Sequence, residues 1–343
     1  MISVIVPIRN EKQFIGATLD SILQQSVDKP TEILVADGMS TDGTRKIIQE
    51  YQSINPSIHI VDNPEKIVST GFNRALSIAR GKVIIRIDGH ASMMPNYISQ
   101  CLKVLEKTGA DCVGGPIFNC SDGIVGKSIN IAQSLKFGVG GAAFRSKIKK
   151  GKFVDTLAFG AYKSNVFKKI GGYDQELVRN QDDEFNYRLI QSGGKIWLDP
   201  SIKSLYYPRT SIPKLFNQYF QYGFFKVRVM QKRKGLASLR HAVPLVFILS
   251  LFSSFFYYLI YKVKMPFLIV SFSYICLSLM SSFNQLIRNL KNWKSTLILP
   301  LIFSTMHFAY GFGYLLGLCY FIFRWGDKEI KDSYFDKTTF INN

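Results

Sequence analysis

Three long uncharged segments in the carboxyl-terminal half constrain the fold of this chain more than any other feature. They cover residues 242–261, 265–287 and 295–323 of the 343-residue sequence. A helix needs about 20 apolar residues to cross the hydrocarbon core of a bilayer, and each segment is long enough. Three such segments in succession without an acidic residue are not typical of the core helices of a soluble protein. We therefore predict about three transmembrane helices within residues 242–325.

The formal net charge of +19 is unevenly distributed along the chain. No Asp or Glu lies between Pro200 and Gly326, whereas fifteen Lys and Arg do. A nucleic-acid-binding protein can be equally basic, but here the basic residues flank apolar runs. Cations in that arrangement are attracted to an anionic membrane surface. The composition therefore favours a membrane, and no nucleic acid, as the partner.

The segment of residues 211–241 mixes aromatic residues with Lys and Arg. This composition predicts an amphipathic helix in the headgroup plane, either touching an acceptor or serving as a plain anchor. The expected organisation is a domain over residues 1–210, this interfacial segment, transmembrane helices over residues 242–325, and a polar tail over residues 326–343. Three full crossings would place the tail on the far side of the membrane from the first domain. A third segment that re-enters or lies flat would keep the tail on the same side.

Short β-branched runs alternate with helical patterns over the first 115 residues. The runs cover residues 2–7, 32–36, 58–61, 83–87 and 111–115. This alternation predicts an α/β fold with a mostly parallel sheet covered by helices on both faces. Ligands of such sheets bind beyond the carboxyl ends of the strands. The residues that follow each run are therefore the candidates for function.

Polar residues follow three of these five runs. Asn10 and Glu11 follow the first run, Asp37 follows the second, and Asp88 and His90 follow the fourth. Carboxylates gathered at one edge of a sheet repel each other unless a cation, a ligand or protons offset their charge. A single polar residue near the start of a helix can be a simple N-cap. Acids after several strands together predict a binding site.

Residues 3–11 and 37–44 resemble the first two signatures of the family 2 glycosyltransferases, which have the A-type nucleotide-sugar-binding fold. Asn73 and Gly81 also lie at that family's usual distances before its metal-binding motif. The apolar carboxyl-terminal region is similar to that of the membrane-anchored, succinoglycan-biosynthesis-like subgroup, whose members assemble exported polysaccharides. The resemblance implies an inverting, metal-dependent, hexosyltransferase-like enzyme.

By this resemblance, seven residues bind the nucleotide-sugar donor. They are Pro7, Asn10, Glu11, Asp37, Asn73, Arg80 and Asp88. A carboxylate can accept a hydrogen bond from a base N–H or a ribose hydroxyl. Many members of the family have an Arg where this chain has Phe72, and we expect Arg80 to supply the missing contact.

The metal-binding Asp-x-Asp motif of that family is represented here by Asp88, Gly89 and His90. A divalent cation, Mn²⁺ or Mg²⁺, stabilises the charge of a departing diphosphate as a Lewis acid. Asp88 supplies a hard oxygen ligand. A second ligand from His90 favours Mn²⁺, because imidazole suits transition metals better than Mg²⁺. Alternatively, His90 orients a phosphate or a water molecule.

Residues 171–188 resemble the acceptor-side signature of the same family, in which an Arg follows the catalytic base by six residues. Arg188 then places the base at Asp182, with Asp183 and Glu184 directly after it. All three acids could instead be first-turn residues that the helix dipole favours. The chemistry needs a base because an acceptor hydroxyl is a poor nucleophile until its proton is removed. One base opposite a departing diphosphate implies inversion at the anomeric carbon.

These features together predict transfer of a sugar from a nucleotide-sugar, expected to be a UDP-sugar, to a lipid-linked saccharide acceptor in bacterial exopolysaccharide, capsule or O-antigen assembly. With no secretory signal before the first strand, we expect a multi-pass protein of the bacterial inner (cytoplasmic) membrane with its catalytic domain in the cytosol. The alternative is an inactive nucleotide-sugar-binding or scaffold protein of a polysaccharide-assembly complex. Such a protein would have no use for Asp88 and Asp182. The chain could also act as an oligomer.

Overall fold

The computed structural model describes residues 1–141, 143–145, 148–208, 210–233, 235 and 239–331. The rest of the predicted polar tail, residues 332–343, lies outside this description. The chain forms two compact units. The first unit contains Met1–Phe118, Ala143–Tyr207 and the chain from Glu329 onward, and the second contains Asn119–Ala142 and Pro208–Lys328.

The first unit is built on an eight-stranded sheet with the order β3-β2-β1-β4-β9-β6-β10-β8. Strands β3, β2, β1 and β4 pair with one another in parallel, and β10 pairs with β6 in parallel. Strand β9 is antiparallel to both β4 and β6, and β8 is antiparallel to β10. In sheet order, the strands are Ile58–Asp62, Thr31–Asp37, Ile2–Ile8, Val83–Arg86, Ala161–Lys163, Cys112–Gly114, Ile196–Leu198 and Lys152–Phe153. A second sheet has the order β5-β11-β7, with strands Ala91–Met93, Ser204–Tyr206 and Ile117–Asn119.

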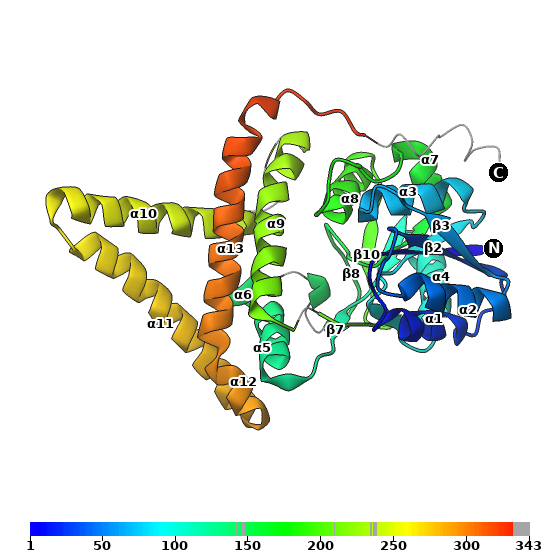
Figure 1. Ribbon diagram of the computed structural model, residues 1–343, viewed down its shortest axis with the longest axis horizontal. Helices are drawn as coiled ribbons and strands as arrows, with labels where there is room; N and C mark the ends of the chain where they lie inside the picture. Colours follow the sequence, from blue (N-terminus) through cyan, green and yellow to red (C-terminus); the bar gives the residue numbers. More distant parts are fainter. Residues whose placement is uncertain (142, 146–147, 209, 234, 236–238, 332–343) are drawn as a thin grey trace. The chain divides into compact units, whose positions relative to one another are not determined.

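Helices cover both faces of the large sheet (Figure 1). Successive side chains of a strand point to opposite faces, and in β1 Val4 and Val6 belong to one hydrophobic cluster while Ile5 belongs to the other. The prediction of an α/β unit with a mostly parallel sheet is therefore confirmed. The helical elements of this unit are α1 (Ile15–Leu23), α2 (Thr44–Ile54), α3 (Val68–Ile78), α4 (Tyr97–Thr108), η1 (Ala143–Arg145), α7 (Ser164–Ile170) and α8 (Gln181–Gln191).

Strands β1, β2 and β4 end at the same edge because they are parallel. The register of β1 with β4 stops at the pair of Ile5 and Arg86, two residues before Pro7. Proline has no N–H to donate to a ladder and is found where pairing ends. The sheet therefore opens at this edge, and the chain enters the loops that carry Asn10 and Asp88.

The second unit is helical. Its elements are α5 (Gly123–Ser134), α6 (Lys136–Val139), α9 (Ile212–Lys232), η2 (Leu239–His241), α10 (Val243–Tyr261), α11 (Met265–Arg288), η3 (Leu290–Asn292), α12 (Trp293–Leu297), α13 (Leu299–Tyr320) and η4 (Ile322–Arg324). Helices α10, α11 and α13 are each long and apolar enough to cross a membrane, which confirms the prediction of three apolar helices.

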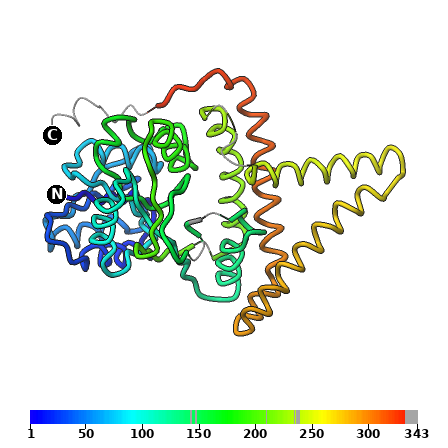
Figure 2. Tube along the Cα trace, turned by 180° about the vertical axis from the view of Figure 1, so that it is seen from behind, coloured from blue at the N-terminus to red at the C-terminus, as the bar shows by residue number. Residues whose placement is uncertain are grey.

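Helices α9 and α13 lie side by side, as both views show (Figures 1 and 2). Glycines allow the two backbones to approach closely: a Cβ atom on Gly223 would lie 2.0 Å from the Tyr310 carbonyl oxygen, and one on Gly313 would lie 2.0 Å from that of Phe220. Arg228 of α9 is fully buried and pairs with Asp327 at 2.9 Å. Arg228, one of the cations of the predicted interfacial segment, is thus paired within this unit and does not face a membrane surface.

Candidate active site

The loops after β1 and β2 are joined by hydrogen bonds. Asn10 has a left-handed backbone (φ 56°), and its side chain accepts a hydrogen bond of 2.9 Å from the Thr41 N–H. Asp37, the last residue of β2, is fully buried and accepts hydrogen bonds from the Ser40 hydroxyl at 2.6 Å and from Arg45 at 3.3 Å. The two predicted donor-binding loops therefore form one rigid rim.

A second group joins the β1 loop to the turn after β4. The Glu11 carboxylate lies 2.9 Å from His90 Nδ1, and the Tyr206 hydroxyl lies 3.2 Å from His90 Nε2. A carboxylate can only accept, so Nδ1 carries the proton, and Nε2 then accepts from the Tyr206 hydroxyl. Gly89 is required in this turn because a Cβ atom there would lie 2.5 Å from a methyl group of Ile8.

Arg86 joins the two acids on which the predicted chemistry depends. Its guanidinium is 2.8 Å from Asp88 and 3.7 Å from Asp182, and its side chain is only 5% exposed. The guanidinium also lies over the ring of Tyr173. Asp88 and Asp182, which are 94 residues apart in the sequence, are thus brought to one site.

The charges of this triad influence each other. Burial disfavours the charged guanidinium of Arg86, but Asp88 and Asp182 raise its pKa, so that it remains a cation. Burial raises the pKa of the Asp182 carboxyl above the ordinary value, although Arg86 acts in the opposite direction. A carboxylate with a raised pKa is a stronger proton acceptor than an ordinary one.

The first turn of α8 contains three acids with different surroundings. Glu184 is buried and bound to Arg188 at 2.6 Å, and Arg188 also donates to the carbonyl oxygens of Ile170 and Gly172. Glu184 therefore holds the loop before α8 in place. Asp182 is the acid that faces Arg86. These contacts favour Asp182 over Glu184 for a role in chemistry.

Asn73 is not brought to the rim with the other predicted donor-binding residues. It is fully buried in α3, and its side-chain amide donates to the Tyr173 carbonyl oxygen at 2.7 Å and accepts from the Tyr173 N–H at 2.8 Å. The neighbouring Phe72 stacks on the ring of Tyr173 at 4.2 Å. Both residues contact the loop that precedes α8, so the structure places Asn73 in a supporting position rather than at the rim.

Arg80 lies at the opposite edge of the sheet. It precedes β4, and its guanidinium forms an ion pair of 2.9 Å with Glu32 near the start of β2. The length of β4 separates Arg80 from Asp88. The structure therefore does not bring Arg80 together with the other predicted donor-binding residues, because a residue before a parallel strand lies at the amino edge.

Sequence reasoning missed Arg86 and Tyr206. Arg86 ends a run of buried β-branched residues, where a charge needs a partner. It precedes Asp88 by two residues, and residues two apart along an extended chain share a face. That signal was present in the sequence. Tyr206 lies on β11, over 100 residues from His90, and no local pattern indicated the contact.

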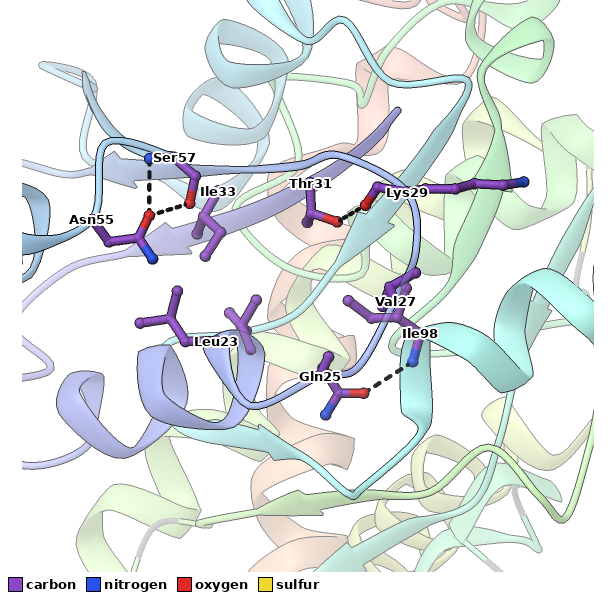
Figure 3. Close-up of a pocket in the computed structure, with 10 residues that line it drawn as sticks. Leu23, Gln25, Val27, Lys29, Thr31, Ile33, Asn55, Ser57 and Ile98 are labelled. Atoms are coloured by element: carbon purple, nitrogen blue, oxygen red, sulfur yellow. Dashed lines mark hydrogen bonds between the residues drawn. The ribbon is translucent and has the colours of Figure 1, made fainter.

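A cavity of about 240 Å³ lies elsewhere in the first unit (Figure 3). It is lined by residues such as Thr31 at the start of β2, Ser57 just before β3, and Lys29. Its lining contains no acid and none of the predicted site residues. We assign no function to it.

The described residues contain no group of three or more His, Cys, Asp or Glu side chains that could hold a metal ion by themselves. Asp88 and His90 are two possible ligands on one turn. The Glu11 contact resembles that of the carboxylate that typically orients a metal-binding histidine. A metal on Nε2 would take the place of the hydrogen bond from the Tyr206 hydroxyl. Mg²⁺ and similar cations are often held by one or two protein groups plus substrate phosphates. The residues therefore fit such a cation.

The mostly parallel sheet with acids at its carboxyl edge agrees with the A-type fold of the glycosyltransferases. A mannosyltransferase from Pyrobaculum calidifontis, solved in complex with GDP-Man and Mn²⁺, has a similar fold with a TM-score of 0.57 and 18% identity. The likeness covers 92% of this chain and 86% of that one. The predicted fold class is thus confirmed.

The chain belongs to glycosyl transferase family 2, whose model matches residues 3–171. It is 31% identical to the succinoglycan biosynthesis protein ExoA of Rhizobium meliloti over 71% of this chain and 74% of that protein. It is 28% identical to a dolichyl N-acetyl-α-D-glucosaminyl phosphate 3-β-D-2,3-diacetamido-2,3-dideoxy-β-D-glucuronosyltransferase of Methanococcus voltae, over 92% of this chain and 97% of that protein. The predicted family and its succinoglycan-like subgroup are confirmed.

Proposed function

We propose that this glycosyltransferase moves a sugar from a nucleoside diphosphate sugar to a hydroxyl group of a lipid-linked acceptor, with inversion of the anomeric centre. The observation that carries the proposal is the Arg86 guanidinium, which lies within 4 Å of both Asp88 and Asp182. One acid is then available on the donor side and the other on the acceptor side. A scaffold protein would have no need for this pair.

Asp182 acts as the general base in this proposal. It accepts the proton of the acceptor hydroxyl as that oxygen attacks the anomeric carbon, and a positioned base typically accelerates such a step by about 10²–10⁴-fold. The raised pKa of its carboxyl supports this role. Arg86 keeps the carboxylate oriented, and a single base without a covalent intermediate gives inversion.

Asp88 would hold a divalent cation, Mn²⁺ or Mg²⁺, with His90 Nε2 as the second protein ligand. When bound, the cation neutralises the diphosphate and stabilises it as the leaving group. Glu11 keeps the proton on His90 Nδ1. The complex of the Pyrobaculum mannosyltransferase with GDP-Man and Mn²⁺ supports a metal in this fold.

The nucleoside lies against the rim formed by the β1 and β2 loops. Asp37 accepts hydrogen bonds from the base or ribose, with Ser40 and Arg45 holding its carboxylate. Asn10 and Pro7 shape the rim beside it. We expect the nucleoside to be uridine. Guanosine is the alternative to be tested, because the Pyrobaculum mannosyltransferase binds GDP-Man.

The acceptor side is proposed from the relatives and from the apolar helices. The Methanococcus relative bears the name of an enzyme that acts on a dolichyl-linked sugar phosphate, and the Rhizobium relative that of a polysaccharide biosynthesis protein. Three apolar helices suit an enzyme whose acceptor is in the bilayer. We place the protein in the bacterial cytoplasmic membrane, with the catalytic unit on the cytosolic side, where nucleotide-sugars are made.

The test is transfer by membranes that contain the expressed chain. Radiolabelled UDP- and GDP-sugars are supplied with polyprenyl phosphate or polyprenyl-diphosphate saccharides, and label extracted into organic solvent is measured with and without chelator. We expect one donor to be consumed in a metal-dependent manner. Asp182→Asn should lose the activity, whereas Asp183→Asn, its neighbour in α8, should retain it. Transfer by Asp182→Asn at the wild-type rate, or in excess chelator, would refute the proposal.

A further inference from the structure

The chain after α13 returns to the catalytic unit. The Gln175 N–H donates a 2.7 Å hydrogen bond to the Lys331 carbonyl oxygen, and the chain from Glu329 onward belongs to the first unit. Only ten residues lie between the end of α13 at Tyr320 and Lys331. After η4, residues 326–331 are mostly polar and form no helix or strand, and such a segment does not cross lipid because its backbone groups would have no hydrogen-bond partners. The end of α13 therefore lies on the same side of the membrane as the catalytic unit.

Helix α13 also packs against α9, and the composition of α9 is unfavourable in a bilayer interior. The two helices run parallel, with Phe220 near Gly313 and Phe224 near Gly317. Their ends are joined by a 2.7 Å hydrogen bond from Arg228 to the Asp327 carbonyl oxygen. If α13 crossed the membrane, α9 would cross with it.

Crossing by α9 is unfavourable because of its charged side chains. The helix contains Lys226, Arg228 and Lys232, and each charge at a bilayer centre costs about 2.5–3.5 kcal/mol on insertion scales. In the most apolar 18-residue stretch of α13, 44% of the residues are buried inside the protein, whereas the corresponding figure for α10 and for α11 is 11%. Much of α13 is thus covered by protein, as expected of a helix that packs at the membrane boundary rather than crossing alone.

Helices α10 and α11 have the opposite character. Together they form a V that leaves the α9–α13 pair and returns to it (Figures 1 and 2). Phe247 near the start of α10 stacks on Tyr274 of α11, close to Phe308 of α13, and beyond this contact most large apolar side chains are exposed. With 19 and 24 residues, the helices are about 28 and 36 Å long, which is sufficient for a core of about 30 Å.

The two ends of this hairpin carry the residues typical of membrane interfaces. At the tip, the exposed Tyr257, Tyr258 and Tyr261 precede the turn that contains Lys262 and Lys264. Aromatic residues of this kind gather at the headgroup level, and lysines beyond them reach water. A tip with this composition suits the far interface.

The base of the hairpin is more basic than the tip. Trp293 is half exposed there, and Arg240, Arg288, Lys291 and Lys294 lie at the starts and ends of the neighbouring helices. Four cations at the base against two at the tip favour the base as the cytosolic end. This is also the end connected to the catalytic unit.

We infer that the chain crosses the membrane twice, as an α10–α11 hairpin whose tip at residues 262–264 reaches the far side. Helix α13 lies at the boundary beside α9, and the tail shares the side of the catalytic unit. This inference resolves the two topologies that the sequence allowed. It does not depend on the proposed chemistry.

Single-cysteine labelling tests the inference. The exposed Cys120, Cys276 and Cys319 are first replaced by Ser, while the buried Cys101 and Cys112 remain. One cysteine is then introduced by Val263→Cys at the tip, Lys291→Cys at the base, Lys328→Cys after α13, or Ser53→Cys on the exposed surface of the catalytic unit. Intact spheroplasts and permeabilised cells are treated with a membrane-impermeant maleimide. Labelling after denaturation confirms that each cysteine can react, and donor binding confirms that each variant is folded.

We expect position 263 to react in intact spheroplasts, and positions 53, 291 and 328 to react only after permeabilisation. Labelling of position 328 on the opposite side from position 53 would show three crossings and overturn the inference. Labelling of position 263 on the same side as position 53 would show a hairpin that enters without crossing, which also overturns it.

Discussion

Replacing Arg86 with Met tests the electrostatic coupling of the site. The buried guanidinium lies between Asp88 and Asp182, and it opposes the rise that burial causes in the pKa of Asp182. Removal of the cation therefore raises this pKa further. Since a general base acts only when it is deprotonated, the acidic limb of the pH profile should move to higher pH.

The size of the shift follows from the geometry. Two unit charges at the 3.7 Å separation of Arg86 and Asp182 interact by about 4 kcal/mol at an effective dielectric constant of about 20. The Asp182 side chain is 27% exposed. Because solvent screening and relaxation of the site weaken the interaction energy, we take about one third of that value. About 1.4 kcal/mol corresponds to roughly one pH unit.

The assay is kcat against pH at saturating donor and metal, for the wild type and for Arg86→Met. The midpoint of the acidic limb should rise by roughly one unit, with partial recovery of the rate at alkaline pH. Arg80→Met is the matched control, because Arg80 pairs with Glu32 at the opposite edge of the sheet. An acidic limb that stays in place, or that moves to lower pH, would refute the coupling.

Two further changes test the metal turn and the helix pair. Glu11→Gln removes the carboxylate that orients His90, and we expect about 10–100-fold weaker activation in a Mn²⁺ titration; unchanged activation would contradict the proposed ligand. Gly313→Val inserts a side chain where a Cβ atom would already lie 2.0 Å from the Phe220 carbonyl oxygen. It should destabilise the detergent-solubilised protein by roughly 1–3 kcal/mol, measured by thermal unfolding, whereas Gly326→Ala, with no atom within 4 Å of its Cβ position, should not.

Much of the site could be predicted from the sequence because parallel strands bring their carboxyl ends to one edge. The ends of the predicted strands were sufficient to locate Asp37 and Asp88. Asp182 was located from the six-residue spacing to Arg188 in the acceptor-side signature of the family. The same rule should have excluded Arg80, which precedes its strand rather than following it. Arg86 could have been found from its buried position two residues before Asp88.

Other features depend on contacts that no local pattern reports. Residues 119–142 belong to the helical unit although they interrupt the sequence of the first unit. One reason is a 2.6 Å hydrogen bond from the Ser128 hydroxyl to the Ser295 carbonyl oxygen, over 167 residues of sequence. By length and hydropathy α10, α11 and α13 all qualify as membrane spans, although the mean hydropathy falls from 2.1 in α10 to 1.3 in α13. The packing of α13 on α9 is a contact that the sequence does not show.

In the proposed mechanism, Asp88 and Asp182 have separate roles at one site. The most direct measurement compares donor binding by calorimetry with single-turnover transfer, both with Mn²⁺, for Asp88→Asn and Asp182→Asn. We predict that Asp182→Asn binds the nucleotide-sugar as the wild type does but transfers at least about 10²-fold more slowly, and that Asp88→Asn loses Mn²⁺-dependent donor binding. Wild-type transfer by Asp182→Asn, or equal loss of donor binding in both variants, would contradict the claim.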